Sequence, residues 1–515
     1  MSTRTAIVVG AGSAGAVVAR RLIDAGVSVT LLEAGGEDTN PAIHDPSRMG
    51  ELWHSEDDWD YRTVPQEHAA GRRLHLPRGK VLGGSHALNA MIWVRCAPAD
   101  FDAWAAQGNT GWAWKDVLPV YKAIEDFSGG ESELHGVGGP LPVTDDYELH
   151  PIQRAIMDAA VEEGLPLNED YNGESLEGVS QQQVTMRDGV RANTWTEYLK
   201  PVRDRLDILV GAHVHSVLIE DGRAVGVRYR FDGEYVELRA DEVVLAAGAL
   251  DSPPILMRSG IGPADELSAL GIDVVRDAPG VGKNLHDHFL APVIFTTTKR
   301  EVGPPQSGMS VTQSHHFWTS LPELPVPDTQ PIHFSVPMYG EMLEPRGDDG
   351  FSLMAGIVTP KSRGTIALSG PGLDDPVLID PQVLADEDDV RSMVASVRKC
   401  RAIGRQPALA DEWGAEEIYP GPDVADDEVE DYVRRTIVTY HHQVGTCRMG
   451  VDDEAVVDPR LKVHGIEGLR VIDASIMPTV TTGNTNAPAV LIGELGARFM
   501  LEDLALTVGA KTAVA

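Results

Sequence analysis

Three glycines near the start of the chain have the types and spacing of a phosphate-binding loop. Gly10, Gly12 and Gly15 directly follow the apolar run Ala6–Val9, and apolar residues at helical spacing come after them. In a dinucleotide site the first glycine permits a tight turn, the second lets the backbone approach a pyrophosphate, and the third lets helix and strand pack closely. A second apolar run ends in Glu33, whose carboxylate can accept hydrogen bonds from ribose hydroxyls. The pattern predicts a dinucleotide site and leaves NAD and FAD both open.

The elements that must position such a site follow from the apolar periodicity. A β-α-β unit is expected over residues 1–35, followed by strands at 207–210, 214–220, 224–229, 242–247 and 468–473 and by helices at 104–125, 152–165, 387–403, 426–436 and 487–501. Four β-rich pieces, at 292–298, 331–336, 351–358 and 364–368, are expected to form one sheet of a second domain. Because the last strand and helix are apolar, we expect them to return to the first domain.

The expected architecture is therefore an α/β fold of two domains. The first is a discontinuous, Rossmann-like dinucleotide-binding domain over residues 1–150, 190–290 and 440–515. The second is an α+β domain built on an antiparallel sheet, over residues 151–189 and 291–439.

Charge and composition exclude several classes of partner. The 515 residues include 78 acidic and 43 basic side chains, a net charge of −35, which argues against nucleic acids and anionic membranes. No apolar run approaches the ~18 residues that cross a bilayer, so no membrane insertion and a cytoplasmic location are expected. Cys96, Cys400 and Cys447 form no CxxC pair, which argues against a disulfide framework or a thiolate zinc site.

Two long glycine-containing segments carry a family resemblance. Pro77-Arg-Gly-Lys-Val-Leu-Gly-Gly-Ser-His-Ala-Leu-Asn-Ala-Met-Ile-Trp-Val-Arg95 resembles the first signature of the glucose–methanol–choline (GMC) oxidoreductases, and Gly248–Gly262 resembles the second. With the N-terminal glycines and a C-terminal segment, the resemblance spans essentially the whole chain. It implies FAD as the cofactor of the Rossmann-like domain. Choline dehydrogenase, hydroxymethylfurfural oxidase and alcohol dehydrogenase-like members look nearest.

The resemblance, together with the glycine pattern, predicts where FAD is bound. The expected cofactor-binding residues are Gly10, Gly12, Ser13, Gly15, Glu33, Arg78, Val81, Gly83, Gly84, Ser85, Asn89, Val214, Asp473 and Ala487. A loop of small residues at 83–85 would lie against the isoalloxazine ring, and Asn89 would hydrogen-bond its polar edge. In choline oxidases a histidine directly before this asparagine bonds covalently to FAD. Here that residue is Leu88, with His86 two places earlier, so FAD is expected to be bound non-covalently.

A histidine-rich segment supplies candidates for acid–base chemistry. Tyr440–Arg448 resembles the catalytic segment of the family, which assigns the role of base to His442 rather than His441. The second catalytic position of the family is His or Asn, and we assign it to Asn486, with Asn484 as the alternative. Alcohol oxidation removes a hydroxyl proton and a hydride. An imidazole that titrates near neutrality can take the proton, and an amide can orient the hydroxyl while flavin N5 takes the hydride.

The predicted substrate is a primary alcohol with an aryl or aliphatic body. Where choline oxidases carry an acidic residue beyond their Asp-His pair, this chain has Leu290, and His333 is expected to face the substrate cavity. His286 and His288 flank Asp287 without a third ligand nearby, so no metal site is expected. Oxygen or another acceptor would reoxidise the flavin. The alternatives are a hydroxynitrile lyase-type protein with structural FAD, and a choline, amino-alcohol or sugar oxidase of the same family.

Overall fold

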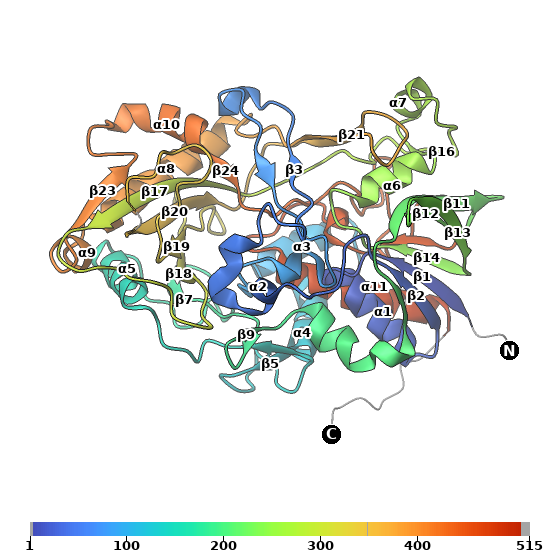
Figure 1. The fold of residues 1–515 in the computed structure, drawn as a ribbon, viewed down its shortest axis with the longest axis horizontal. Coiled ribbons are helices and arrows are strands. Elements are labelled where there is room, and N and C mark those ends of the chain that lie inside the picture. The colour runs from blue at the N-terminus through green and yellow to red at the C-terminus, as the bar shows by residue number, and fades with distance from the viewer. Residues whose placement is uncertain (1–3, 348, 506–515) are drawn as a thin grey trace.

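The strands of the computed structural model, which describes residues 4–347 and 349–505, gather into two main sheets that lie side by side (Figure 1). The expected segments 1–150 and 440–515 begin and end in residues 1–3 and 506–515, which lie outside the described ones. One sheet is parallel and carries the N-terminal glycines. The other is antiparallel and lies towards the helices drawn in orange and cyan.

The parallel sheet has five strands among the described residues. Their order is β10 (Asp207–Leu209), β2 (Ser28–Leu32), β1 (Thr5–Val9), β14 (Glu242–Leu245) and β25 (Leu469–Val471). Helices α1 (Ser13–Asp24) and α11 (Asn486–Asp503) pack so closely that a Cβ on Gly493 would lie 2.8 Å from Ala14 O. Segments from distant parts of the chain therefore build one layer, as the apolar C-terminal strand and helix indicate.

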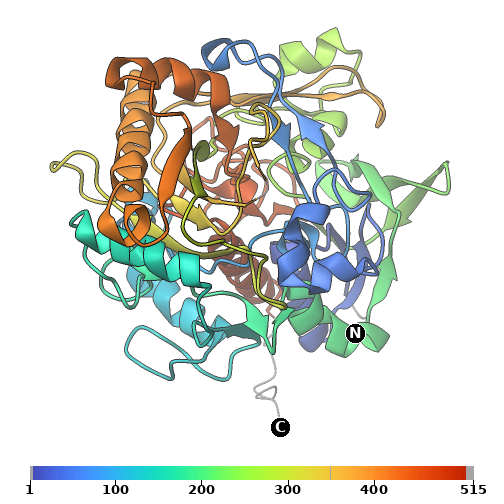
Figure 2. The ribbon, with the colours of Figure 1, turned by 60° about the vertical axis from the view of Figure 1, so that its left-hand side comes forward.

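The antiparallel sheet runs β23 (Ala415–Tyr419), β17 (Phe289–Thr297), β20 (Phe351–Ile357), β19 (Ile332–Phe334), β18 (Thr312–Phe317) and β7 (Gly178–Gln181), with β24 (Val438–Thr439) beside β17. One face packs on α5 (Pro151–Glu162), α8 (Glu387–Gly404) and α10 (Val429–Thr436), in the layer that comes forward in Figure 2. Along β17, Phe289 and Val293 join that core, whereas Leu290 joins the core of the parallel sheet. The alternation of a strand thus divides its side chains between the two halves of the molecule.

Two predicted elements differ from the structure, and one strand was not predicted. β21 (Thr365–Leu368) pairs with β22 (Val377–Asp380) in a hairpin of its own instead of joining the antiparallel sheet. The helix expected at 104–125 is two helices, α3 (Pro98–Ala106) and α4 (Trp114–Ile124), because Gly108 and Gly111 take positive φ between them. β18 has no counterpart among the predicted strands because its residues, although all buried, are mostly polar.

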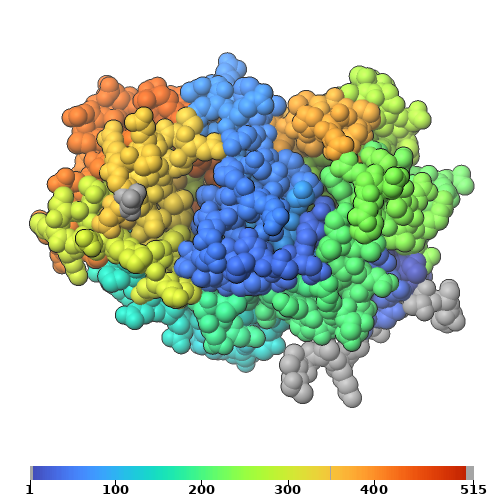
Figure 3. Space-filling view, in the orientation of Figure 1, coloured from blue at the N-terminus to red at the C-terminus, as the bar shows by residue number. Residues whose placement is uncertain are grey.

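The remaining elements frame the space between the two sheets. A meander of β11 (His213–Glu220), β12 (Arg223–Phe231) and β13 (Glu234–Arg239) turns at Asp221-Gly222 and is followed by α6 (Ser252–Arg258) and α7 (Ala264–Ala269). The segment after β2 contains α2 (Pro41–His44), β3 (Tyr61–Arg62), β4 (His75–Leu76) and the short helix η3 (Gly84–Ala87). Its surface, drawn in blue, separates the yellow and green surfaces in Figure 3.

Among the described helices, none combines the length and the apolar character that crossing a bilayer requires. Cys96, Cys400 and Cys447 are buried and unpaired.

Candidate active site

A cavity of about 620 Å³ lies between the two sheets. On one side it is lined by the loop after β1, the end of β2 and the loop that contains η3. On the other side it is lined by β17, β19 and β20, and the segments around residues 440 and 485 complete it. The cavity is therefore shared by both halves of the molecule.

Two glycine loops form the cofactor side of this cavity. Gly12 lines it, and a Cβ added to Gly84, which has φ +54°, would lie 2.7 Å from Gly12 Cα. The Gly83 N–H donates to Ala11 O over 3.0 Å, so the loops are joined backbone to backbone. Together they leave a cradle without side chains, which suits the close approach of a pyrophosphate and a flat ring.

Charge and hydrogen-bonding groups in this cradle match a dinucleotide. Gly12, the N-cap of α1, offers no side-chain acceptor, so the first amides of the helix and its positive dipole end are available to phosphate. The Glu33 carboxylate accepts from the N–H groups of Ala11 and Gly35, both at 2.8 Å. Burial raises the pKa of Glu33 to about 7. Ribose hydroxyls would supply further donors to this carboxylate.

The expected cofactor residues fall into two groups. Those that line the cavity are Gly10, Gly12, Ser13, Glu33, Arg78, Gly84, Ser85, Asn89, Val214 and Asp473. Gly15, Val81, Gly83 and Ala487 are not among the residues that line it. Gly15 is needed for packing, because a Cβ there would lie 2.0 Å from Gly10 O. Val81 belongs to a small apolar core with Ile43 and Leu52.

Leu88, which stands at the position of the covalent histidine of choline oxidases, and His86 lie in different surroundings. His86 is fully buried outside the cavity lining, and its Nε2 lies 3.2 Å from Thr185 Oγ1. Leu88 lines the cavity. The residue nearest in type to a covalent anchor is therefore turned away from the cofactor cradle.

The segment that carries His442 is fixed by a buried carboxylate. Asp287 Oδ1 accepts from the His442 N–H at 2.8 Å, and its Oδ2 accepts from Gln443 Nε2 at 2.6 Å and from the Thr439 hydroxyl. Burial raises the pKa of Asp287 to about 6. The adjacent His441 takes a left-handed conformation, with φ +67°, and packs edge-on against Trp53. Asp287 thus anchors the strand-like segment and leaves the His442 ring to face the cavity.

His288 is a functional neighbour that the sequence did not reveal. Its Nδ1 lies 2.9 Å from His442 Nδ1, and Tyr440 stacks on the His442 ring with centroids 4.6 Å apart. Burial, followed by the nearby His288 and His441, lowers the pKa of His442 well below its ordinary value. The imidazole is neutral near pH 7, so one of its nitrogens has a free lone pair. Residues 288 and 442 are far apart in the chain, so no sequence motif predicts their contact.

The amide next to His442 belongs to Asn484, which corrects the choice of Asn486. Asn484 Nδ2 lies 3.3 Å from His442 Nε2, whereas Asn486 Nδ2 donates to Ser13 Oγ at 2.9 Å. Asn486 is the first residue of α11, and the helical turn directs it towards the start of α1. Gln330 Nε2 donates to Asn484 Oδ1 at 2.8 Å and fixes the orientation of the amide. Gln330 is a second neighbour without a sequence signal.

Apolar side chains form the substrate side of the cavity. Those contributed by the antiparallel sheet are Leu290, Pro292, Ile332, Phe334 and Met354. Leu290 lines the cavity, whereas His333, expected to face it, does not, because alternate residues of β19 point to opposite faces. His333 bonds instead to Ser314 Oγ at 2.8 Å and to His316 Nδ1 at 3.0 Å. The wall beside His442 and Asn484 therefore favours a hydrophobic group.

Comparison with known proteins agrees with this geometry. Two family models, both described as GMC oxidoreductase, match residues 4–290 and 360–493. The chain belongs to the GMC oxidoreductase family. An alcohol dehydrogenase [acceptor] from Pseudomonas putida is 40% identical over 531 residues, which cover 96% of this chain and 95% of the relative.

Two solved structures share the fold of this chain. A pyridoxine 4-oxidase from Mesorbium loti superposes with a TM-score of 0.92 at 37% identity, over 96% of this chain and 99% of that one. A formate oxidase from Aspergillus oryzae, studied for modification of its FAD, gives a TM-score of 0.90 at 26% identity, over 98% and 99%. GMC oxidoreductases bind FAD, and the cradle between the two glycine loops has the donors and the space for it.

Proposed function

We propose that this oxidoreductase oxidises primary alcohols with an apolar body to aldehydes, with His442 as the base and Asn484 orienting the hydroxyl. The observation that carries the proposal is the pairing of His442 Nε2 with Asn484 Nδ2 at 3.3 Å on the wall of the shared cavity. A hydroxyl oxygen held between these two groups would meet one acceptor and one donor. That combination is what the removal of a hydroxyl proton requires.

FAD would be held without a covalent bond by the two glycine loops, by Glu33 and by Asp473. Asp473 Oδ2 accepts from the Gly248 N–H at 2.9 Å and from Ser252 Oγ at 2.5 Å, which fixes this carboxylate at the cavity wall. The burial of His86 outside the cavity supports dissociable binding. When bound, FAD supplies the acceptor for the hydride that leaves the alcohol carbon. Oxygen or another acceptor then takes the electrons.

The protonation of His442 follows from its neighbours. Because Gln330 fixes the Asn484 amide with its Nδ2 towards His442, the Nε2 of that histidine is the hydrogen-bond acceptor. Its proton then resides on Nδ1 and is donated to His288 Nδ1, 2.9 Å away. His288 thus selects the tautomer in which the nitrogen that faces the cavity can accept the hydroxyl proton.

The substrate class follows from the wall beside this pair. Leu290, Phe334 and Met354 line the cavity, and Glu341, the lining carboxylate that the antiparallel half contributes, is already paired with Arg62. A quaternary ammonium group would lose its hydration shell there without gaining a counter-charge. An aryl or aliphatic chain would gain about 25 cal/mol for each Å² of apolar surface that it buries.

The test is an anaerobic visible spectrum of the purified enzyme titrated with hexanol, benzyl alcohol, hydroxymethylfurfural and choline. We expect hexanol or benzyl alcohol to bleach the flavin absorption at far lower concentration than choline does. A matched Leu290→Glu variant should move this preference towards choline, because it adds a counter-charge to the wall. A yellow enzyme that none of the alcohols bleaches would contradict the proposal and favour a lyase with structural FAD.

A further inference from the structure

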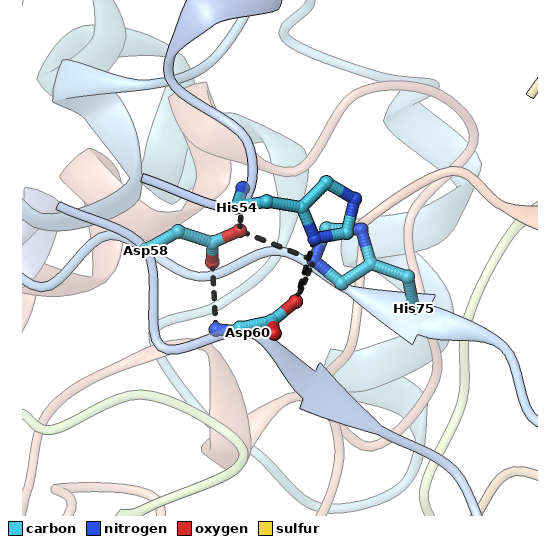
Figure 4. A group of neighbouring side chains, drawn as sticks. All are labelled: His54, Asp58, Asp60 and His75. Atoms are coloured by element: carbon cyan, nitrogen blue, oxygen red, sulfur yellow. Dashed lines mark hydrogen bonds and ion pairs between the residues drawn. The ribbon is translucent and has the colours of Figure 1, made fainter. Parts of the chain in front are cut away.

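Four side chains at the mouth of the cavity form a cluster that alcohol oxidation does not use. His54, Asp58, Asp60 and His75 each direct one nitrogen or oxygen to a common centre, and these four atoms all lie within 4.8 Å of one another (Figure 4). We propose that this mouth cluster binds a divalent transition-metal cation of the Zn²⁺ type. The inference does not depend on the proposed reaction.

The separations between the four atoms suit one cation. His54 Nδ1 lies 2.7 Å from Asp60 Oδ1, and His75 Nε2 lies 3.1 Å from both Asp58 Oδ2 and Asp60 Oδ1. Ligands about 2.0–2.1 Å from a tetrahedral Zn²⁺ are themselves roughly 3.3 Å apart. Small side-chain adjustments would therefore admit the ion at the centre of the cluster. The rings of His54 and His75 are stacked, with centroids 3.9 Å apart, so both nitrogens approach from neighbouring positions.

The backbone holds the ligands in place before any ion binds. β3 and β4 pair antiparallel, which brings Asp60, directly before β3, next to His75 on β4. The buried Asp58 carboxylate accepts from the N–H groups of His54 and Asp60 at 3.0 Å and of Arg78 at 2.9 Å. His54 and Asp60 both take left-handed φ, at 60° and 51°, which non-glycine residues rarely adopt. A cation would replace the His75 contact of Asp58 without disturbing these backbone bonds.

The ligand types and charges select the class of cation. Two neutral imidazoles and two carboxylates supply a charge of −2, which balances a divalent ion. Mixed nitrogen and oxygen ligands without a thiolate favour Zn²⁺ and its neighbours in the transition series, whereas Ca²⁺ requires six to eight oxygens. As a simple ion pair, the half-exposed His54 and Asp60 would add little to the stability of the protein, because solvent screens their attraction. Ion pairing alone therefore gives little reason for four such groups to converge.

The site lies where it can act on access to the cavity. His54 and His75 line the cavity together with Glu341, which comes from the antiparallel half and bonds Arg62 Nη1 at 2.9 Å. An ion in the mouth cluster would tie the loop at residues 54–60 to β4, whose chain continues into Arg78 of the cofactor cradle. Binding is thus expected to stiffen the rim of the cavity.

The experiment uses the untagged holoenzyme after dialysis against a chelator. Titration calorimetry with Zn²⁺, checked by metal analysis after gel filtration, should show one equivalent per chain and a raised melting temperature. His75→Gln and Asp60→Asn should each weaken binding at least about tenfold. The matched control is His68→Gln, which alters an exposed histidine of the same segment outside the cluster and should bind Zn²⁺ as the unaltered enzyme does.

The result that overturns the proposal is defined by the same measurements. If the unaltered enzyme binds no stoichiometric Zn²⁺, or if His75→Gln and Asp60→Asn bind it unchanged, the mouth cluster is only a hydrogen-bonded network. The flavin spectrum and the melting temperature without metal show whether each variant is folded. Asp60 is half exposed, so its variant keeps the test available where the His75 variant is unstable.

Discussion

Backbone atoms form one wall of the cavity, and side chains form the other. The cofactor wall is backbone, brought close by glycines such as Gly12 and Gly84, whose loops touch. The substrate wall consists of side chains: Leu290 comes from β17, Phe334 from β19, and His442 from a segment that Asp287 holds in place. Backbone requirements leave a signature in the sequence because only glycine meets them, whereas a wall of side chains is defined only after the strands have folded. The cofactor wall can therefore be recognised from the sequence, whereas the substrate wall requires the structure.

Among variants that affect only one of the two walls, His442→Ala is expected to change the reaction rate most. Loss of the base should slow anaerobic reduction of the flavin by alcohol about 10²–10⁴-fold. Because His442 belongs to the substrate side, the variant should retain its yellow colour and flavin content. Stopped-flow absorbance with hexanol or benzyl alcohol measures the rate. Reduction at a near-normal rate by the same alcohol would show that His442 is not the base.

A smaller and more discriminating effect is expected from the two asparagines near the start of α11. Asn484→Ala should slow flavin reduction about 10²-fold, because it removes a donor from the reacting oxygen. Asn486→Ala removes only the bond to Ser13 and should weaken FAD binding by up to about tenfold, with the chemical step little changed. Single-turnover kinetics and flavin dissociation measured by fluorescence separate the two. The opposite pattern would return the catalytic role to Asn486.

A change at Glu33 is expected to have the smallest effect on the reaction rate. It should instead change how the stability of the fold depends on pH. Burial raises the pKa of Glu33 from 4.5 to about 7, so the folded flavin-free protein holds a proton that the unfolded chain has lost. The stability that this provides is complete below pH 4.5 and disappears as the pH rises through 7, a change of about 3 kcal/mol.

The comparison for this prediction is Glu33→Gln, which stays neutral at every pH. Urea unfolding of both flavin-free proteins between pH 5 and pH 8 should show the unaltered protein losing stability relative to the variant. Parallel profiles would mean that Glu33 is ionised in the folded state throughout. With FAD bound, both proteins should reduce their flavin at similar rates, since Glu33 belongs to the cofactor wall.

Particular residues show how far the sequence determines the fold and the site. The order strand, Gly10, Gly12, helix, strand, Glu33 fixes the local geometry, so the cradle was predictable. His288 and Gln330 were not predictable, because a contact across more than 150 residues, such as that of His288 with His442, arises only when β17 and β24 pair. The choice between Asn484 and Asn486 depended on where α11 begins, a boundary that sequence patterns locate least well.

His333 illustrates the same limit on a strand. Its neighbours Ile332 and Phe334 face the cavity, and a shift of one residue in the expected phase of β19 exchanges the inward and outward positions. The three-residue strand offers too little alternation to fix that phase from sequence alone. In the neighbouring strand β18, buried polar residues hide the alternation of apolar and polar side chains that would mark a strand.

The parallel sheet also sets an order of events during synthesis. Four of its strands, β10, β2, β1 and β14, are complete once residue 245 has left the ribosome, but β25 and α11 follow more than two hundred residues later. Until then the face of α1 that α11 covers has no partner, and Asp473, Asn484 and Asn486 are missing from the cavity. At a synthesis rate of about 5–20 residues per second, this apolar surface stays uncovered for tens of seconds. The cavity is therefore complete only at the end of translation, after the antiparallel half has been made.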